Sequence, residues 1–331
     1  MKFTKTIFAC AALSALVSSC SNDSEPSFDP NEIRISTSVG GSDILTRATN
    51  DATNLQNTEF VNNELINVYL AEHSPQAGET KTTYSNPIKY KKVTESNGAN
   101  MQAVSQQQYF PVNGGNVDAW GFYPAITDDT GYNITESSTS FTVETNQSDY
   151  ANYRKSDLMF GTNNPNNEDS FEGTAKGHIV PLTFKHKLSK IVVTLADGGG
   201  VVANRFTDAT IKMYGPKTTS TISATKDGIT LSGSTTGDAT EGYNLGTYND
   251  NGNAAIIIPQ TINQNTDFLK VTLSTANGGK TYIYKLDEDK EFKEGYVYTF
   301  NLKLTSGKLE VKTEITNWNP GDSKNGTANI E

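Results

Sequence analysis

The residue with the most specific predicted chemistry is a cysteine close to the start of the chain. Cys20 follows two lysines, an apolar stretch over residues 7–17 and small residues. A basic start, an apolar run of this length and a small-residue site are typical of a secretory signal peptide, and the run is too short for a transmembrane helix. Val17-Ser18-Ser19-Cys20 also resembles a bacterial lipobox, so we expect residues 1–19 to be removed and Cys20 to be lipidated. The alternative is a soluble secreted protein that is cleaved elsewhere.

Residues suited to catalysis or metal binding are few and scattered. His73 lies in a polar segment, while His178 and His186 are eight residues apart on one predicted strand. A zinc site needs more clustered ligands than this, so we expect His186 to be structural. The sequence has no Gly-Xaa-Ser-Xaa-Gly elbow and no phosphate-binding loop. We therefore expect no enzyme activity, no cofactor and no metal.

Two acidic segments could bind calcium and a few aromatic residues could bind sugar, but both indications are weak. Asp128-Asp129-Thr130-Gly131 and Asn249-Asp250-Asn251-Gly252-Asn253 lack the EF-hand pattern, so turns are the preferred interpretation. Trp120, Tyr123 and Tyr150 would suit a sugar-binding platform. Core burial is the preferred interpretation for Trp120, because apolar residues surround it. An enzyme that acts on extracellular polysaccharide is accordingly disfavoured.

Length, charge and cysteine count limit the possibilities further. The chain has 331 residues, a net charge of −10 and two cysteines. Cys10 lies in the signal peptide, so the mature chain keeps only Cys20 and forms no internal disulfide. Packing must stabilise the fold, and about 310 mature residues suffice for two hydrophobic cores. The acidic balance argues against nucleic acid as a partner.

Short alternating segments separated by turns predict an all-β protein of antiparallel sandwiches. In the first segment, Ile33, Ile35 and Val39 share one face. Thr305-Ser306-Gly307 predicts a hairpin between the last two strands. The other predicted strands cover residues 65–70, 88–93, 117–123, 179–186, 187–195, 209–214, 228–231, 254–258, 268–274, 281–286, 296–304 and 309–315.

The same pattern suggests how the chain divides. Residues 20–47 follow the signal peptide as a lipid tether and first strand, and we place two β-sandwich domains at residues 48–187 and 188–331. No Pro/Gly/Ser linker marks this boundary. Residues 146–167 are expected to be irregular, and residues 231–243 to form a long surface loop. The predicted core around the boundary consists of Leu182, Phe184, Leu188, Ile191, Val193 and Leu195.

Several motifs, taken together, resemble the fimbrillin family, the lipoprotein pilins of type V pili. Their order and spacing fit along nearly the whole mature chain. The motifs are the lipobox with Thr46-Arg47-Ala48 downstream, Trp120-Gly121-Phe122-Tyr123-Pro124, Phe184-Lys185-His186-Lys187-Leu188-Ser189-Lys190-Ile191, and the set Ile256-Ile257-Ile258-Pro259-Gln260, Gly295-Tyr296-Val297-Tyr298-Thr299-Phe300-Asn301-Leu302 and Ile315-Thr316-Asn317-Trp318.

The resemblance implies two transthyretin-like domains and export to the outer membrane as a lipid-anchored precursor. It also implies that an arginine-specific surface protease cuts after Arg47, leaving Ala48 as the first residue. The cut removes the first strand, whose plugs would be Ile33, Ile35 and Val39, and so opens a hydrophobic groove. A terminal strand of another pilin subunit, of the same or a different kind, then fills the groove by β-strand addition. For Arg47 the alternative is a surface arginine in a loop.

The tail departs from the expected donor strand. After Trp318, only Ala328 and Ile330 offer apolar plugs. Either this is a tip or accessory subunit that donates no strand, or residues 309–315 swing out as the donor. The expected function is a structural fimbrial subunit in cell adhesion. The alternative is a non-polymerising surface lipoprotein that binds glycan or host protein.

Overall fold

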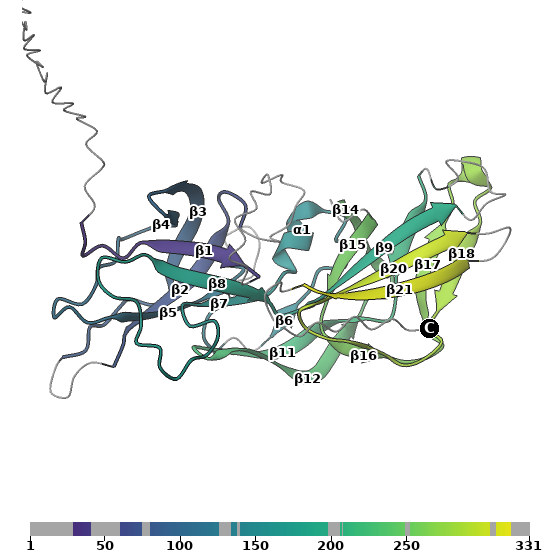
Figure 1. The fold of residues 1–331 in the computed structure, drawn as a ribbon. Helices are drawn as coiled ribbons and strands as arrows, with labels where there is room; N and C mark the ends of the chain where they lie inside the picture. Colours follow the sequence, from purple (N-terminus) through teal and green to yellow (C-terminus); the bar gives the residue numbers. More distant parts are fainter. Residues whose placement is uncertain are drawn as a thin grey trace, which may run out of the picture.

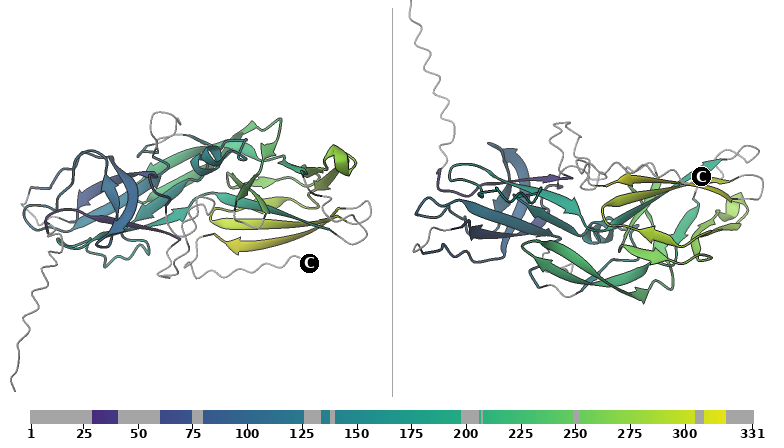
Figure 2. Two further views of the ribbon diagram at one scale, coloured as in Figure 1. Left: turned by 90° about the horizontal axis from the view of Figure 1, so that it is seen from above. Right: turned by 60° about the horizontal axis from the view of Figure 1, so that its bottom comes forward.

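The computed structural model describes residues 29–40, 60–74, 80–125, 134–137, 140–197, 206, 208–248, 252–304 and 309–318. The regular secondary structure of these residues is almost entirely β-strand, with one α-helix of six residues and one short 3₁₀ helix. The predicted all-β class is therefore confirmed. The molecule is elongated, with the N-terminal strands at one end and the C-terminal strands at the other (Figures 1 and 2).

Seven strands of the N-terminal half close into a barrel in the order β1-β4-β3-β2-β5-β7-β8. Neighbouring strands are antiparallel except β1 and β8, which are parallel. β1 lies between β4 and β8, so it completes the ring and covers two strand edges at once. The strands are β1 Ile35–Val39, β2 Leu65–Glu72, β3 Ile88–Ser96, β4 Ala99–Ala103, β5 Val117–Tyr123, β7 Met159–Thr162 and β8 Val180–His186.

The C-terminal half contains a five-stranded sheet, β14-β15-β9-β20-β21, and three smaller sheets, β13-β10-β17-β18, β12-β11-β6 and β16-β19. Within the five-stranded sheet, β9 and β20 are parallel. The strands are β6 Phe141–Thr142, β9 Ser189–Asp197, β10 Thr210–Met213, β11 Lys217–Thr225, β12 Gly228–Asp238, β13 Tyr243–Asn244, β14 Gly246–Tyr248, β15 Gly252–Ile257, β16 Gln260–Ile262, β17 Asp267–Thr272, β18 Thr281–Lys285, β19 Lys290–Phe292, β20 Tyr296–Leu304 and β21 Leu309–Asn317.

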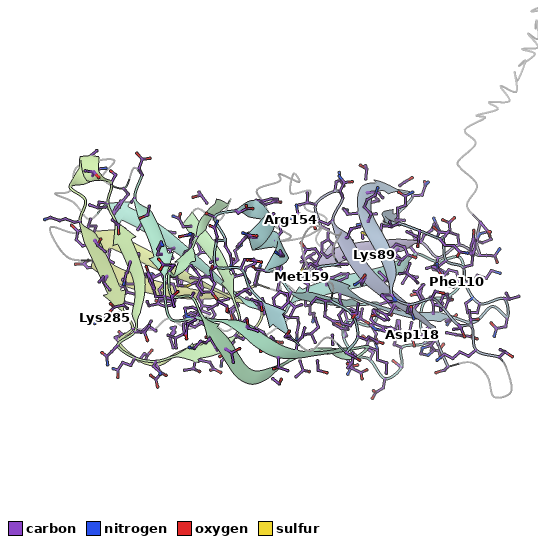
Figure 3. All side chains as sticks on the ribbon, turned by 180° about the vertical axis from the view of Figure 1, so that it is seen from behind. Lys89, Phe110, Asp118, Arg154, Met159 and Lys285 are labelled. Atoms are coloured by element: carbon purple, nitrogen blue, oxygen red, sulfur yellow. The ribbon has the colours of Figure 1, made fainter. Side chains whose placement is uncertain are left out.

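We keep the domain boundary after residue 187, between β8 and β9, as a proposal. Residues before the boundary also pack with the C-terminal half: β6 pairs with β11, and Tyr153 of α1 (Tyr150–Lys155) belongs to the same core cluster as Ile191 and Phe268. In Figure 3, Arg154 of this helix lies near the middle of the molecule, between Lys285 at one end and Phe110 and Asp118 at the other. Residues 141–155 thus bridge the two halves.

Two hydrophobic cores hold the described elements. The barrel core joins the inward side chains of β1 to those of the other barrel strands, including Tyr90 and Phe184. Phe184 packs over Gly161 of β7, where an added Cβ would clash with its ring. The second core fills the C-terminal half and reaches Tyr69 of β2 and Phe122 of β5. Of the core residues predicted at the boundary, Leu195 is half-buried and the others are buried.

Two predictions about local structure are wrong. Residues 231–243 do not form a long loop, because β12 runs to Asp238 and pairs with β11. This strand is rich in threonine, serine and glycine, so it carries no apolar alternation, yet threonine is a good strand former. Residues 146–167 are not irregular throughout, since they contain α1 and β7. A helix of six residues is too short to show a 3.6-residue period.

Candidate functional site

The candidate site is the slot that β1 occupies between β8 and β4 (Figure 1). On the β8 side the pairing is regular, from Ile35 opposite Val180 to Val39 opposite Phe184. Val180 N donates to Arg34 O at 2.8 Å, and Gly40 N donates to Phe184 O at 2.7 Å. β8 therefore provides a continuous backbone edge for a parallel strand.

On the β4 side, a side chain takes over much of the backbone's role. β1 and β4 share a single register pair, Ile35 opposite Met101. At Thr37, the backbone N–H donates to Asn100 Oδ1 at 2.7 Å, and Asn100 Nδ2 donates to Thr37 O at 2.9 Å. The Thr37 hydroxyl also donates to Asn100 Oδ1, at 3.1 Å. One amide side chain thus satisfies the donor and the acceptor of a whole backbone unit.

The inward face of this segment fills the barrel core. Ile33 and Ile35 are fully buried, and Val39 is 1% exposed. These are the three predicted plugs. Thr37 is a fourth inward residue, 4% exposed, and it was not predicted because its polar side chain hides the alternation. Complete burial of an aliphatic side chain is worth about 1.5–3 kcal/mol, so the three plugs contribute much of the affinity of β1 for the slot.

The residues before β1 are also held by the barrel. Ile33 N donates to Gln108 O at 2.8 Å, and Gln107 Nε2 donates to Ile33 O at 2.8 Å. The last described residue of this segment is Gly40, whose φ is 83°. Cys20, Arg47 and Ala48 lie outside the described residues, so their predicted lipidation and cleavage remain predictions.

The second strand relevant to the site is β21, at the edge of the five-stranded sheet. It pairs with β20 from Leu304 opposite Leu309 to Tyr296 opposite Asn317, which agrees with the predicted hairpin. Inward and outward residues alternate along it, yet the inward ones are only half-buried. A cavity of about 500 Å³, lined in part by Val311 and Thr313, lies beside it. β21 is thus packed less completely than β1.

The end of β21 is tied to the barrel through an aromatic stack. Trp318 lies on the ring of His186, the last residue of β8. His186 is buried, and its Nδ1 is 2.8 Å from Asp157 Oδ1. Trp318 N donates to Gly295 O at 2.7 Å, and Lys190 Nζ lies 5.6 Å from the centre of the indole ring. His186 is therefore a packed, hydrogen-bonded structural residue.

The other residues singled out in the sequence do not converge on one site. His178 is exposed, and His73 Nδ1 is 2.7 Å from Asp118 Oδ1 at the rim of a cavity of about 740 Å³. Trp120 lines the same cavity, half-buried, and stacks on Tyr69. In the part of the chain that the structure describes, no group of three or more His, Cys, Asp or Glu residues is placed to hold a metal ion.

The three aromatic residues considered for a sugar platform have different surroundings. Tyr123 is buried in the barrel core, where its hydroxyl donates to Glu64 Oε2 at 3.2 Å. Glu64 also pairs with Arg154 Nε at 2.5 Å. Burial raises the pKa of the Glu64 carboxyl, and the positive charge of Arg154 opposes this rise. On α1, the guanidinium carbon of Arg154 lies 5.2 Å from the centre of the Tyr150 ring. Tyr150 and Tyr123 therefore both pack around the Glu64–Arg154 pair.

The described residues contain no helix long and apolar enough to span a membrane.

Comparison with known proteins gives the class of the molecule. The model of the Fimbrillin-like family matches residues 46–318. A relative from Bacteroides uniformis (strain ATCC 8492), named "Putative fimbrium subunit Fim1C", is 24% identical over 341 residues, covering 99% of this chain and 99% of the relative.

Two crystal structures share the fold, each of a "putative cell adhesion protein" from a Bacteroides species. The one from Bacteroides uniformis is 19% identical, with a TM-score of 0.57, and the match covers 87% of this chain and 98% of that one. The one from Bacteroides ovatus is 15% identical, with a TM-score of 0.58, and the match covers 87% and 97%. At these identities the likeness shows the fold alone.

The fold and the matched family define a fimbrial protein of a cell-surface appendage. The chain belongs to the Fimbrillin-like family, as the resemblance in its sequence predicted.

Proposed function

We propose that this protein is a structural fimbrial subunit that is lipidated at Cys20, cleaved after Arg47 and assembled by strand exchange. Its partners are other pilin subunits, and its precursor is anchored to the outer membrane by lipid. The observation that carries the proposal is the position of β1. It completes a barrel whose remaining strands all follow Arg47 in the chain, so one cut between β1 and β2 separates it covalently from that barrel.

The slot has the properties that a strand-accepting groove requires. Removal of β1 exposes the edges of β4 and β8, and an uncovered strand edge pairs readily with another chain. It also empties the pockets of Ile33, Ile35 and Val39, which are buried in the barrel core. Backbone hydrogen bonds then give an incoming strand its affinity, and alternate side chains give it specificity.

The family match agrees with a separate first segment. The matched region begins at residue 46, next to Arg47, and so excludes β1. It ends at residue 318 and includes all of β21. By this division the cleaved body keeps its C-terminal strand and loses its N-terminal one.

Within the described residues, β21 is the best candidate for the donated strand. It is an edge strand with a single neighbour, β20. Its inward residues are half-buried, whereas those of β1 are 0–4% exposed. Transfer of β21 into the slot of another copy would therefore bury its apolar side chains more fully, which favours exchange. The alternative, a tip subunit, accepts a strand and donates none.

The experiment that tests the proposal is mass spectrometry of the protein from surface fibres and from membranes, with the N-terminus mapped. We expect the fibre form to begin at Ala48 and the membrane form to carry lipid on Cys20. If only the lipidated form exists, even after treatment with an arginine-specific protease, the proposal fails. A non-polymerising surface lipoprotein that binds glycan or host protein would then take its place.

A further inference from the structure

Asn100 binds both the backbone and the side chain of Thr37 in the strand beside it. Its amide bonds to Thr37 N and Thr37 O would form with any residue at that position, because they involve backbone atoms alone. The bond from the Thr37 hydroxyl to Oδ1 requires a side chain that bears a hydroxyl. Asn100 is 6% exposed and Thr37 is 4% exposed, so water does not readily replace this bond.

The slot therefore has four inward positions of two kinds. The first, second and fourth, filled by Ile33, Ile35 and Val39, are apolar. The third, filled by Thr37, is a small polar pocket facing Asn100. A strand that fits the slot fully needs three apolar residues and a hydroxyl-bearing residue in this order.

This spacing occurs at two threonines in the whole chain. One is Thr37, and the other is Thr313 of β21. Ile33-Arg34-Ile35-Ser36-Thr37-Ser38-Val39 and Leu309-Glu310-Val311-Lys312-Thr313-Glu314-Ile315 have aliphatic residues four and two positions before the threonine and two positions after it. No other threonine in the 331 residues has large apolar residues at all three of these positions.

The structure places the matching residues of β21 on one face. Leu309, Val311, Thr313 and Ile315 are half-buried, and the residues between them are exposed. Val311 and Thr313 line the cavity beside the strand. In its present position Thr313 thus sits next to open space, and the buried partner that Thr37 has in Asn100 is available in the slot.

We propose that Asn100 selects the incoming strand by its hydroxyl, and that the selected strand is β21 of a second copy of this chain. Leu309, Val311, Thr313 and Ile315 take the places of Ile33, Ile35, Thr37 and Val39. The inference rests on the proposed strand exchange. It adds the residue that recognises the incoming strand, the hydroxyl group that this residue binds, and the register of the strand in the slot. It makes this protein a donor as well as an acceptor.

Register is the property that such a contact fixes best. A shift by one residue would turn the charged face of β21 into the core. A shift by two residues would place Val311 or Ile315 against Asn100, and the hydroxyl bond would be lost. Apolar pockets tolerate Leu, Val and Ile almost equally, so they distinguish these shifts poorly. The polar pocket removes the ambiguity.

The first test measures binding of fluorescent peptides to the mature chain cleaved after Arg47. The natural peptide covers residues 307–318, and its variants are Thr313→Val, Thr313→Ser and, as an outward-facing control, Lys312→Ser. We expect Thr313→Val to bind about fivefold more weakly, as one lost hydrogen bond predicts. The serine variant and the control should stay within about twofold of the natural peptide. In Asn100→Ala protein the difference between threonine and valine should vanish, which isolates the pair.

The second test traps the register. In the slot, Ser38 lies opposite Thr183 of β8, and Glu314 would take the place of Ser38. The chain has no cysteine after residue 47, so a Glu314→Cys peptide should form a disulfide with a Thr183→Cys protein. Lys312→Cys and Thr316→Cys peptides should react less. Preferential trapping of either of these would overturn the proposed register.

The outcomes distinguish selection of the hydroxyl by Asn100 from donation of β21. If the valine peptide binds as tightly as the natural one, Asn100 does not select the hydroxyl, although strand exchange stands. If none of the peptides binds the cleaved protein, β21 is not the donor and the donor assignment in the proposed function fails with it. Circular dichroism of uncleaved Asn100→Ala protein checks that the variant is folded.

Discussion

The imidazole ring of His186 lies flat on the indole ring of Trp318, with ring centroids 3.8 Å apart and an angle of 7° between the planes. His186 ends the strand that borders the β1 slot, and Trp318 directly follows the last residue of β21. The buried carboxylate of Asp157 lies 2.8 Å from Nδ1 of the same imidazole ring. This stacked pair therefore joins β8, which borders the slot, to the end of β21, the proposed donor strand.

Substitution of Trp318 should loosen β21 before it affects the barrel. Trp318→Ala removes a large side chain that is 6% exposed, and we expect a loss of about 3–5 kcal/mol in the free energy of unfolding of the region it anchors. Amide hydrogen exchange of residues 309–317 should become faster, while exchange of β2 and β5 should change little. Trp318→Phe keeps an aromatic stack and serves as the control. Unchanged exchange in β21 would show that the stack does not anchor it.

Substitution of an inward residue of β1 should affect the precursor and leave the cleaved body unaffected. Ile35→Ala should lower the free energy of unfolding of the uncleaved protein by about 2–5 kcal/mol, because the side chain is fully buried. The outward, half-buried Ser36→Ala is the matched control, expected within about 0.5 kcal/mol. After cleavage behind Arg47 and removal of the fragment, all three proteins are identical in sequence. Denaturant unfolding before and after cleavage measures both states.

A disulfide across β20 and β21 should block donation reversibly. Thr299 lies directly opposite Glu314, and Cα atoms opposite each other in antiparallel strands are close enough for a disulfide. Thr299→Cys with Glu314→Cys should prevent fibre growth under oxidising conditions and restore it after reduction, as electron microscopy would show. The single variant Thr299→Cys is the control. Fibres formed by the oxidised double variant would mean that β21 stays in place during assembly.

Cleavage at Arg47 should be required for release of β1. Arg47→Ala protein should accumulate as the lipidated precursor and form no fibres, whereas Arg34→Ala should be processed normally. The peptide bond after Arg34 is held against β8, because the Arg34 carbonyl oxygen accepts a hydrogen bond from Val180 N, so we expect a protease to cut there less readily. Immunoblots of membrane and fibre fractions distinguish the forms. Fibres made of Arg47→Ala protein would place the cut elsewhere.

Glu64 should make the stability of the barrel depend on pH. Burial raises its pKa above 4.5, although Arg154 opposes the rise. A carboxyl whose pKa is raised on folding stabilises the fold fully below the unfolded value, and this contribution is lost as the pH rises through the folded value. The free energy of unfolding of the natural protein minus that of Glu64→Gln should therefore fall as the pH rises above 4.5. An increase with pH would show that the ion pair outweighs burial.

The sequence indicated much of the fold through apolar alternation. It located β1 and β21 and identified Ile33, Ile35 and Val39, because buried strands repeat every two residues. Thr37 shares that face and was missed because it is polar. The role of Asn100 could not be predicted from the sequence around it, because Asn100 contacts a residue that lies 63 positions away in the chain. The stack of His186 on Trp318 is equally non-local.

The positions of the β1 slot in the barrel and of β21 in the five-stranded sheet have a consequence for the shape of any assembly. If β21 of one molecule fills the slot of the next, every contact joins the C-terminal half of one molecule to the barrel of its neighbour. These two parts lie at opposite ends of the molecule (Figure 1). Such a head-to-tail contact has no two-fold axis, and without closure into a ring it repeats indefinitely as a helix. A filament built by the proposed strand exchange would therefore be polar, with an empty slot at one end and a strand that has not been donated at the other, so its two ends would grow through different contacts.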